Sequence, residues 1–241
     1  GLRLHALPAN LGFIGASSAG AAIARGRFLL FLNNDTVPQP GWLDGMHATF
    51  DAQGGVGIVG AQLVYPDGRL QEAGAMLARD GRGESRGRFA DPAHPAFAWC
   101  ADVDYVSGAA LMIERRLFER LGGFDPRYAP AYYEDTDLAF RVRDAGLRVL
   151  VQPVARVVHL EGVSAGTDLT RGMKAAQARN LPVFEARWRH ALASRPIDPV
   201  AAGQVPPPGT PQVLIVDNLT PSPDRDSASL RLVNLMRLLR E

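Results

Sequence analysis

The sequence is poor in cysteine, in net charge and in long apolar runs, and each shortage argues against a class of protein. Cys100 is the only cysteine among 241 residues, so no disulfide can form within the chain. The formal net charge of +1 gives no sign of a nucleic-acid-binding face or an acidic tail. No apolar run reaches the ~18 residues that a membrane-spanning helix needs.

What the sequence does have is apolar content, at 46% of residues, which is enough to bury a sizeable core. Residue 1 is glycine, no signal peptide follows, and the first residues read as the interior of a domain. We therefore expect a fragment of a longer protein. The single cysteine fits a reducing compartment, so we expect a cytoplasmic location, with the inner face of the membrane as a second one.

Helical and strand-like patterns alternate along most of the chain. The run "RFLLFLN" is continuously apolar, which is typical of a strand covered on both faces. Helices are predicted at 40–53, from 134 onward and at about 170–193, where Pro182 should kink or divide the helix. The alternation predicts an α/β fold: a mostly parallel mixed sheet flanked by helices.

The composition changes near residue 195. Prolines crowd residues 195–211, which predicts a stiff, extended linker. After it, "QVLIVDNL" starts a new buried strand and "SASLRLVNLMRLLRE" a helix. We therefore expect a first domain at 1–194, a linker at 195–211 and the beginning of a second domain at 212–241.

Oxygen-bearing side chains follow the apolar run 28–32. In open α/β sheets, ligands bind outside the carboxyl ends of strands. Asn33 and Asp35 could therefore offer hard oxygens to Mg²⁺ or Mn²⁺, and a metal ion there would neutralise a diphosphate. The same residues precede a threonine and a proline, and asparagine and aspartate are also common in ordinary turns. These residues alone leave both interpretations open.

A second acidic cluster, Glu134, Asp135 and Asp137, lies at a predicted helix start. Acids favour the first turn of a helix, so capping explains part of the cluster. Residues 134 and 137 are three apart and share a face, whereas Asp135 points about 100° away. We expect Asp135 to face a cleft, where the neighbouring Tyr132 and Tyr133 would provide a dry setting for a general base.

His159 ends the strand-like segment "ARVVHL". A neutral imidazole at a strand end can ligate Mn²⁺, although a hydrogen-bonded histidine at a sheet edge is commoner. We expect Asp35 and His159 to approach closely enough to share a divalent ion. The arginine-rich stretch 78–95 reads either as a lid over phosphates or as a solvated loop.

Two long segments resemble a family 2 glycosyltransferase of the GT-A fold, over roughly residues 1–190. The first is "NLGFIGASSAGAAIARGRFLLFLNNDTVPQPGWL", which resembles the segment leading into the DxD motif. The second is "VSGAALMIERRLFERLGGFDPRYAPAYYEDTDLAFRVRDAGLRVLVQPVARVVHLEGVS", which resembles the acceptor-site and ED-motif segment. The resemblance implies an inverting, metal-dependent transfer of a sugar from a nucleotide-sugar donor. The acceptor would be a saccharide or lipid-linked molecule in cell-surface polysaccharide synthesis.

Roles carry over from the resemblance residue by residue. Asp35 stands at the metal-binding DxD position, with Asn33 in place of the first acid, and His159 completes the metal site in some relatives. Asp135 stands at the position of the catalytic base, with Glu134 as its supporting neighbour. The remaining implied contacts are Asn10, Gly12, Asn34 and Asp35 on the donor side, and Ser107, Gly108 and Asp137 on the acceptor side.

Three features qualify the resemblance. The family's opening strands are absent, so the nucleotide pocket is expected to be incomplete and the chain inactive alone. The tail 212–241 resembles the first βα unit of a GT-B glycosyltransferase, which implies a parent chain with further transferase domains. The implied partners are a sugar nucleotide, the acceptor and the membrane surface, without nucleic acid.

Three other classes of protein place acidic residues after an apolar strand or share this architecture. A haloacid-dehalogenase-type phosphatase needs an aspartate nucleophile where this chain has Asn33. A sugar-nucleotide pyrophosphorylase stays open, because its Gly-rich loop would lie before residue 1. A non-catalytic saccharide-binding or scaffold module is the main alternative, and the presence of both Asp35 and Asp135 favours the enzyme.

Overall fold

The computed structural model describes residues 3–160, 175–199 and 227–238. The chain divides into two compact units, residues 1–205 and 206–241, and the division falls inside the predicted linker. In the second unit the described part is one helix, α6 (Ser227–Leu238), where the sequence predicts a helix. The strand expected from residue 212 lies outside the described residues, and the GT-B assignment of this unit stays a prediction.

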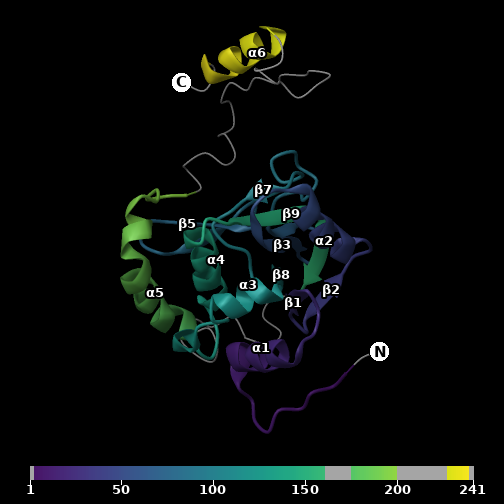
Figure 1. Ribbon diagram of the computed structural model, residues 1–241, viewed down its shortest axis with the longest axis vertical. Helices are drawn as coiled ribbons and strands as arrows, with labels where there is room; N and C mark the ends of the chain where they lie inside the picture. The colour runs from purple at the N-terminus through teal and green to yellow at the C-terminus, as the bar shows by residue number, and fades with distance from the viewer. Residues whose placement is uncertain (1–2, 161–174, 200–226, 239–241) are drawn as a thin grey trace. The chain divides into compact units, whose positions relative to one another are not determined.

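The first unit is a central sheet with helices on both faces (Figure 1). The main sheet has the order β1 (Phe28–Leu32), β8 (Ala110–Glu114), β3 (Val56–Val64), β9 (Arg148–His159), β2 (Thr36–Pro38), with β4 (Leu70–Glu72) beside β3 and β7 (Ala101–Asp102) beside β9. A separate two-stranded sheet pairs β5 (Ala75–Leu77) with β6 (Gly83–Ser85). The helical elements are α1 (Gly12–Ile23), α2 (Trp42–Ala52), α3 (Arg115–Arg120), η1 (Pro126–Tyr128), α4 (Glu134–Asp144) and α5 (Ala175–Ala193).

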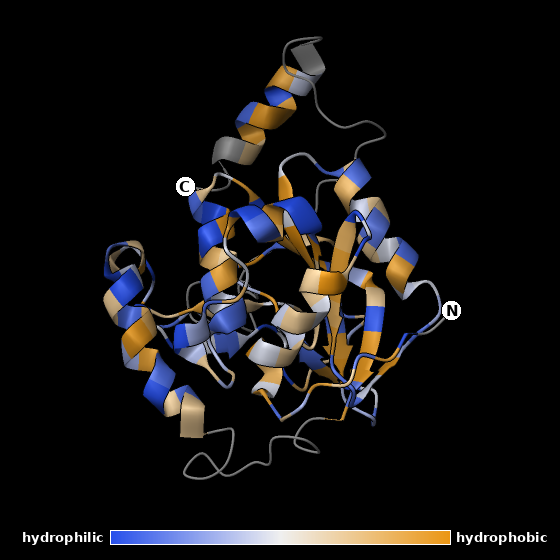
Figure 2. Cartoon of the chain, turned by 60° about the horizontal axis from the view of Figure 1, so that its bottom comes forward, coloured by the Kyte–Doolittle hydropathy of each residue, from blue (hydrophilic) through white to orange (hydrophobic). Residues whose placement is uncertain are grey.

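Strand β1, at one end of the described strand order, is covered on both faces, as the apolar run 28–32 predicts. Leu29 and Phe31 belong to the core shared with α1, α3, α4 and α5. Phe28 and Leu30 pack on the opposite face, in the core to which α2 contributes Met46. Figure 2 shows the result as hydrophobic strands inside and mixed colouring on the helices. The α/β class with flanking helices is therefore confirmed.

The expectation of a mostly parallel sheet is wrong. Among the described pairings only β3 with β9 is parallel, whereas β1–β8, β3–β8, β2–β9, β3–β4 and β7–β9 are antiparallel. Two strands that are consecutive in a sheet can be parallel only if the chain crosses over between them, usually through a helix. Residues 65–109, all of which are described, contain strands and loops but no helix, so β8 returns antiparallel to β3.

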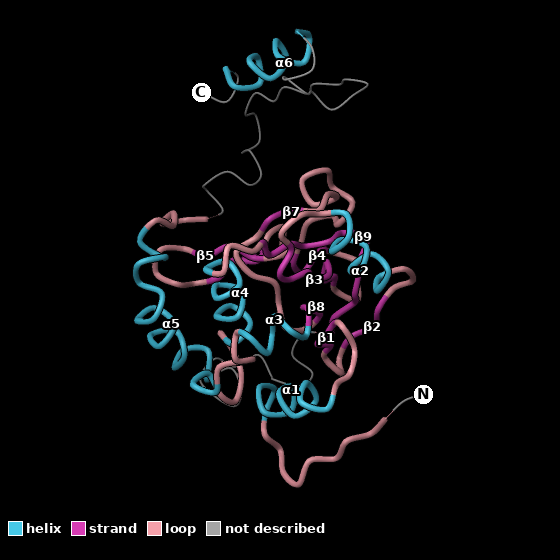
Figure 3. The backbone as a smooth tube through the Cα atoms, in the orientation of Figure 1, coloured by secondary structure: helices cyan, strands magenta, loops and turns pink. Residues whose placement is uncertain are grey.

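Helix α5 is interrupted at a different residue from the one predicted. The chain stays helical across Pro182, and the non-helical backbone is at Trp188 (φ −104°, ψ 16°). There the indole Nε1 donates to Asp137 Oδ1 at 2.9 Å, which ties α5 to α4. Figure 3 shows α5 running alongside α4, and Phe140 and Phe184 join the two helices with ring centroids 5.2 Å apart.

The packing of β3 predicts the effect of adding a methyl group at Gly60. A Cβ there would lie 2.4 Å from Val106 Cβ, so Gly60→Ala should destabilise the fold by about 1–3 kcal/mol through overpacking. The matched control is Gly20→Ala in α1, where nothing lies within 4 Å and alanine should stabilise the helix by up to about 1 kcal/mol. Urea unfolding measures both, and equal free energies for the two variants would contradict the packing described.

Candidate functional site

The predicted site residues gather at the carboxyl ends of β1, β3 and β9. Strand β2 runs antiparallel to the end of β9, with Thr36 opposite His159. Asp35 directly precedes Thr36, so this register brings its side chain next to that of His159. Asp35 Oδ1 lies 3.4 Å from His159 Nε2, and both side chains are largely buried. The expected approach of Asp35 and His159 is confirmed, and their role as metal ligands stays a prediction.

The second ring nitrogen of His159 is held by a residue that sequence reasoning missed. His159 Nδ1 lies 2.8 Å from Gln71 Oε1 on β4. Because the carboxamide oxygen accepts, Nδ1 carries a proton, and Nε2 is the ring nitrogen that faces Asp35 and could ligate a cation through its lone pair. A metal-ligating histidine is usually oriented by such a contact, so the pair fits a divalent cation.

The rest of the expected metal motif has a structural task. Asn33 donates its backbone N–H to Ala109 O at 3.0 Å, and its carbonyl accepts from Thr36 Oγ1 at 2.6 Å, so it fixes the turn between β1 and β2. Asn34 is exposed in the same turn. Within the described ranges, no group of three or more His, Cys, Asp or Glu side chains could hold a metal ion. Asp35 and His159 would therefore supply two ligands, leaving the others to substrate or water.

The Ser107–Gly108 turn, before β8, holds Asp135. Gly108 N donates to Asp135 Oδ2 at 2.9 Å, and Thr136 N donates to Asp135 Oδ1 at 2.7 Å. Helix α4 begins at Glu134, and of the three acids in its first turn only Asp135 is partly exposed. The expectation that Asp135 points away from the other two acids is confirmed. Burial raises the pKa of the Asp135 carboxyl, although these hydrogen bonds oppose the rise.

Glu134 is 5% exposed, and its Oε2 has no hydrogen-bond partner among the described residues. Burial raises the pKa of Glu134 well above its ordinary value, and the negative charge of Asp135 adds to the rise. A buried carboxyl in this condition favours its protonated form. Glu134 is thus a buried neighbour of Asp135, and its catalytic role stays a prediction.

Asp137, expected to contact the acceptor, is instead fully buried in an ion-pair network. Its Oδ2 accepts from Arg141 Nε at 2.7 Å, while Oδ1 accepts from Tyr128 Oη at 3.2 Å and Trp188 Nε1 at 2.9 Å. Arg187 Nη1 lies 2.9 Å from the same Oδ1. Both oxygens are occupied by protein donors, so the structure supports an anchor between α4 and α5 in place of an acceptor contact.

Glu72, at the end of β4, is a further acid that sequence reasoning missed. Its Oε1 accepts from Ser107 N at 3.0 Å, directly beside the amide that binds Asp135. Burial raises the pKa of Glu72 to about 7, and the charge of Asp135 contributes to the rise. The signal was in the sequence: Asp67-Gly68 after the strand 56–64 indicates a tight turn that returns the chain to the same edge.

The donor-side loop lies at the start of α1. Asn10 Oδ1 accepts from Gly12 N at 2.9 Å, which satisfies one of the open amides of that helix end. Gly12 has φ +67°, and a Cβ there would lie 2.6 Å from Pro130 Cβ, so the position requires glycine. The loop therefore packs on the segment before α4 and helps to place Asp135. Donor binding by Asn10 and Gly12 stays a prediction.

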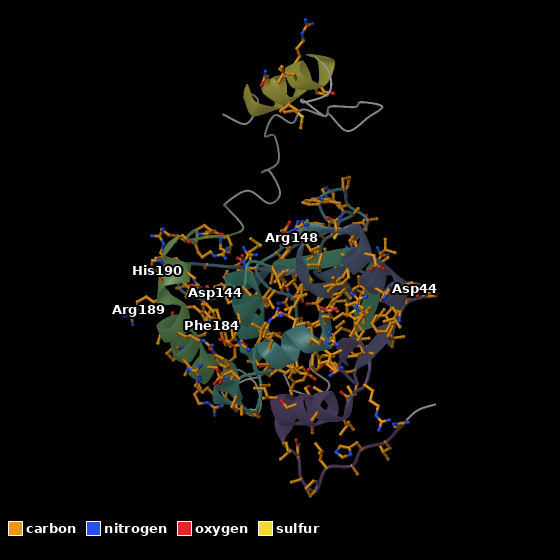
Figure 4. The ribbon with its side chains drawn as sticks, in the orientation of Figure 1. Asp44, Asp144, Arg148, Phe184, Arg189 and His190 are labelled. Atoms are coloured by element: carbon orange, nitrogen blue, oxygen red, sulfur yellow. The ribbon has the colours of Figure 1, made fainter. Side chains whose placement is uncertain are left out.

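The segment that leads into α4 is strained. Tyr132 and Tyr133 both have positive φ, 74° and 73°, which is uncommon for residues other than glycine. Asn180 on α5 is 1% exposed and donates through Nδ2 to the carbonyls of Tyr128 (2.7 Å), Ala131 (3.0 Å) and Tyr132 (2.9 Å). Helix α5 thus holds the strained turn that aims Asp135, with Phe184 facing inward and Arg189 and His190 facing out (Figure 4).

The arginine-rich stretch 78–95 is largely tied to the protein. Arg86 is buried and donates to Ala73 O at 3.1 Å, so the lid interpretation is wrong for this residue. Arg79 donates to Arg195 O at 3.2 Å, and Arg82 Nε donates to Asp80 at 2.6 Å.

A cavity of about 430 Å³ lies at the opposite end of the sheet from these residues. It is lined by Arg25, Arg27, Glu114, Arg115 and Arg116. These residues precede β1 or end and follow β8, whereas the Ser107–Gly108 turn and residue 33 lie at the other ends of the same strands. A five-residue strand spans roughly 17 Å, so this cavity is separate from the candidate site.

Comparison with known proteins agrees with this geometry. The profile of glycosyl transferase family 2 matches residues 1–122, just over half of the 241 residues. The chain belongs to glycosyl transferase family 2. Its fold matches that of a crystal structure of GalNAc-T7 with UDP, GalNAc and Mn²⁺, with a TM-score of 0.56, at 16% identity and covering 82% of this chain and 40% of that one.

Curated relatives of this family 2 chain come from several bacteria. The uncharacterised protein y4gI of Sinorhizobium fredii is 32% identical over 190 residues, covering 76% of this chain and 21% of that protein. The O-antigen biosynthesis protein RfbC of Myxococcus xanthus is 35% identical over 151 residues, which cover 60% of this chain and 12% of that protein. The N-acetylglucosaminyl-diphospho-decaprenol L-rhamnosyltransferase of Mycobacterium tuberculosis is 28% identical over 153 residues, which cover 58% of this chain and 49% of that protein. The chain thus spans half or less of the length of these relatives.

In the parts of the chain that the structure describes, none of the helices combines the length and apolar character needed to cross a membrane.

Removing the clamp on the strained turn should cost stability. Asn180→Ala leaves the buried carbonyls of residues 128, 131 and 132 without their donor, so we expect a loss of about 1–3 kcal/mol or more. Gln177→Ala, exposed on the same helix, should change the free energy of unfolding by less than about 0.5 kcal/mol. Denaturant titration distinguishes the two, and similar values would contradict the role of Asn180.

Proposed function

We propose that this chain carries the catalytic residues of an inverting glycosyltransferase, which moves a sugar from a nucleotide-sugar donor to an acceptor hydroxyl. The observation that carries the proposal is the position of Asp135. It is the partly exposed acid of its helix turn, it is held by the Gly108 amide, and it lies at the same end of the sheet as Asp35 and His159. Membership of family 2 and the GT-A-like fold support the same reaction class.

The chain's own residues would divide the chemistry between two sides. On the acceptor side, Asp135 would take the proton from the attacking hydroxyl, so that the new bond forms as the bond to the leaving diphosphate breaks. The Gly108 amide would keep the carboxylate aimed during that step. On the donor side, the departing diphosphate develops negative charge that must be stabilised. Much of the remaining rate enhancement would come from holding the two substrates in line.

A divalent cation, Mn²⁺ or Mg²⁺, fits the donor side. Asp35 and His159 would hold it, because their facing atoms are 3.4 Å apart and Gln71 orients the imidazole. When bound, such an ion neutralises diphosphate charge. Asn33, which stands where the resemblance implies a first acid, leaves one coordination position for water or substrate.

The relatives narrow the acceptor class. One is named for O-antigen biosynthesis and another for transfer to a diphospho-decaprenol-linked sugar. These names support a saccharide or lipid-linked acceptor in cell-surface polysaccharide synthesis. A parent protein with further transferase domains accords with the small share of those relatives that this chain spans.

A non-catalytic saccharide-binding module is the alternative, and Asn33 in place of an acid is the observation that favours it. The two proposals differ in one measurement on the full-length protein that contains this chain: the release of nucleoside diphosphate from a panel of sugar nucleotides in the presence of Mn²⁺. Release by the protein supports the transferase, whereas saccharide binding without release supports the module.

The first functional prediction concerns the base. Asp135→Asn should retain the fold, because its carboxamide oxygen can still accept from Gly108 N, and should lower turnover by about 10²- to 10⁴-fold. Asp144→Asn, exposed at the end of the same helix, is the matched control and should leave turnover unchanged. Near-normal transfer by Asp135→Asn, measured as nucleoside diphosphate release, would show that another group is the base.

The second concerns the metal. Mn²⁺ should raise the melting temperature of the protein, since a ligand at a hundred times its Kd stabilises the folded state by about 2.7 kcal/mol. Asp35→Asn and His159→Gln should each remove most of this stabilisation. Asp44→Asn, in the first turn of α2, should retain it. An equal Mn²⁺ response in all four proteins would exclude the site at Asp35 and His159.

A further inference from the structure

Two carboxyl groups from different elements are bound by neighbouring backbone amides. Ser107 N donates to Glu72 Oε1 at 3.0 Å, and Gly108 N donates to Asp135 Oδ2 at 2.9 Å. Glu72 ends β4, whereas Asp135 lies in the first turn of α4. Because the two amides are consecutive, the turn holds the two carboxyl groups close to each other.

Anchoring the turn does not by itself require an acid at position 72. Glu72 is 8% exposed, and among the described residues its Oε2 accepts from Ser85 Oγ at 3.3 Å, while the positive charge of Arg88 opposes the rise of its pKa. A glutamine could accept the same bond from Ser107 N without a charge. Burying one carboxylate beside another is costly, so a glutamate here needs a reason beyond structure.

We propose that Glu72 is a positioning residue of the transfer reaction, which fixes the Ser107–Gly108 turn beneath Asp135 and places a second carboxyl group against the base. The inference rests on the proposed function, in which Asp135 takes the proton of the acceptor hydroxyl. Glu72 touches neither substrate in this scheme, and acts through the turn and through its charge.

The buried surroundings of Glu72 and Asp135 determine how the charge of one affects the pKa of the other. Burial raises the pKa of Glu72 to about 7, and the negative charge of Asp135 adds to the rise, so the two carboxyl groups titrate as a coupled pair. Above about pH 7 the Glu72 anion makes Asp135 a stronger base. The other titratable or charged groups that act on these two carboxyls or adjoin them are Glu134, Tyr105, Tyr133 and Arg88.

The pH profile of kcat/KM tests this coupling. In the wild-type protein the rate should rise through an inflection near pH 7, as Glu72 ionises. In Glu72→Gln the hydrogen bond to Ser107 N is kept and the charge is lost. The inflection should therefore disappear and the alkaline rate should fall severalfold, because Asp135 without the neighbouring anion is a weaker base.

The matched control is Glu84→Gln, an exposed acid on the neighbouring strand β6, which should retain the wild-type profile. Glu72→Ala also removes the anchor of the turn, so it should lower kcat further and raise KM for the acceptor. If Glu72→Gln and Glu84→Gln both keep the inflection, the proposal is wrong.

A measurement without turnover separates this proposal from the proposed function. Carbon-13 NMR of labelled carboxyl groups should show two coupled titration steps for Glu72 and Asp135 in the wild-type protein, and one in Glu72→Gln. A single unshifted Asp135 step in both proteins would overturn the coupling itself. Coupled titration with no effect on the rate profile would instead refute Asp135 as the base, and with it the role of Glu72.

Discussion

The amides of Ser107 and Gly108 donate to the two carboxyl groups around which the site is arranged. Hydrogen bonds to an ionised acceptor are stronger than neutral ones, and they offset part of the penalty for burying Glu72 and Asp135. The turn can do this because β8 lies between β1 and β3 in the sheet. Its start is therefore held at the sheet end where β4 and α4 also arrive.

A second constraint acts from α5. The turn into α4 holds two tyrosines at positive φ, a conformation that costs of order 1–3 kcal/mol for each residue and persists only when the surroundings enforce it. Asn180 supplies three donor contacts to the carbonyls of that segment, and Asp137 ties the first turn of α4 to Trp188 and Arg187. The partly exposed Asp135 is thus positioned by residues with which it makes no described hydrogen bond.

Sequence reasoning succeeded where the signal was local. The apolar run 28–32 predicted a doubly covered strand, and the three-residue spacing of Glu134 and Asp137 predicted that Asp135 would point elsewhere. It failed where distant segments decide the outcome. The alternation of helices and strands elsewhere outweighed the lack of a helical pattern in residues 65–109, which is what makes β8 antiparallel to β3. A buried Asn180 reads like any polar residue on a helix. The burial of Asp137 in an ion-pair network could not be predicted from its own segment, because its partners on α5 lie about fifty residues further along the chain.

The two halves of the site are joined by main chain. Asn33 N donates to Ala109 O, so the turn before the metal-side residue Asp35 is bonded to the residue that follows Gly108. The pair Asp35–His159 and the pair Glu72–Asp135 are therefore positioned through one short segment, residues 107–109. Gln71 and Glu72, adjacent on β4, extend the same link, because Gln71 orients His159 while Glu72 binds Ser107. Successive residues of a strand point to opposite faces, which lets this one short strand contact both His159 and the Ser107–Gly108 turn.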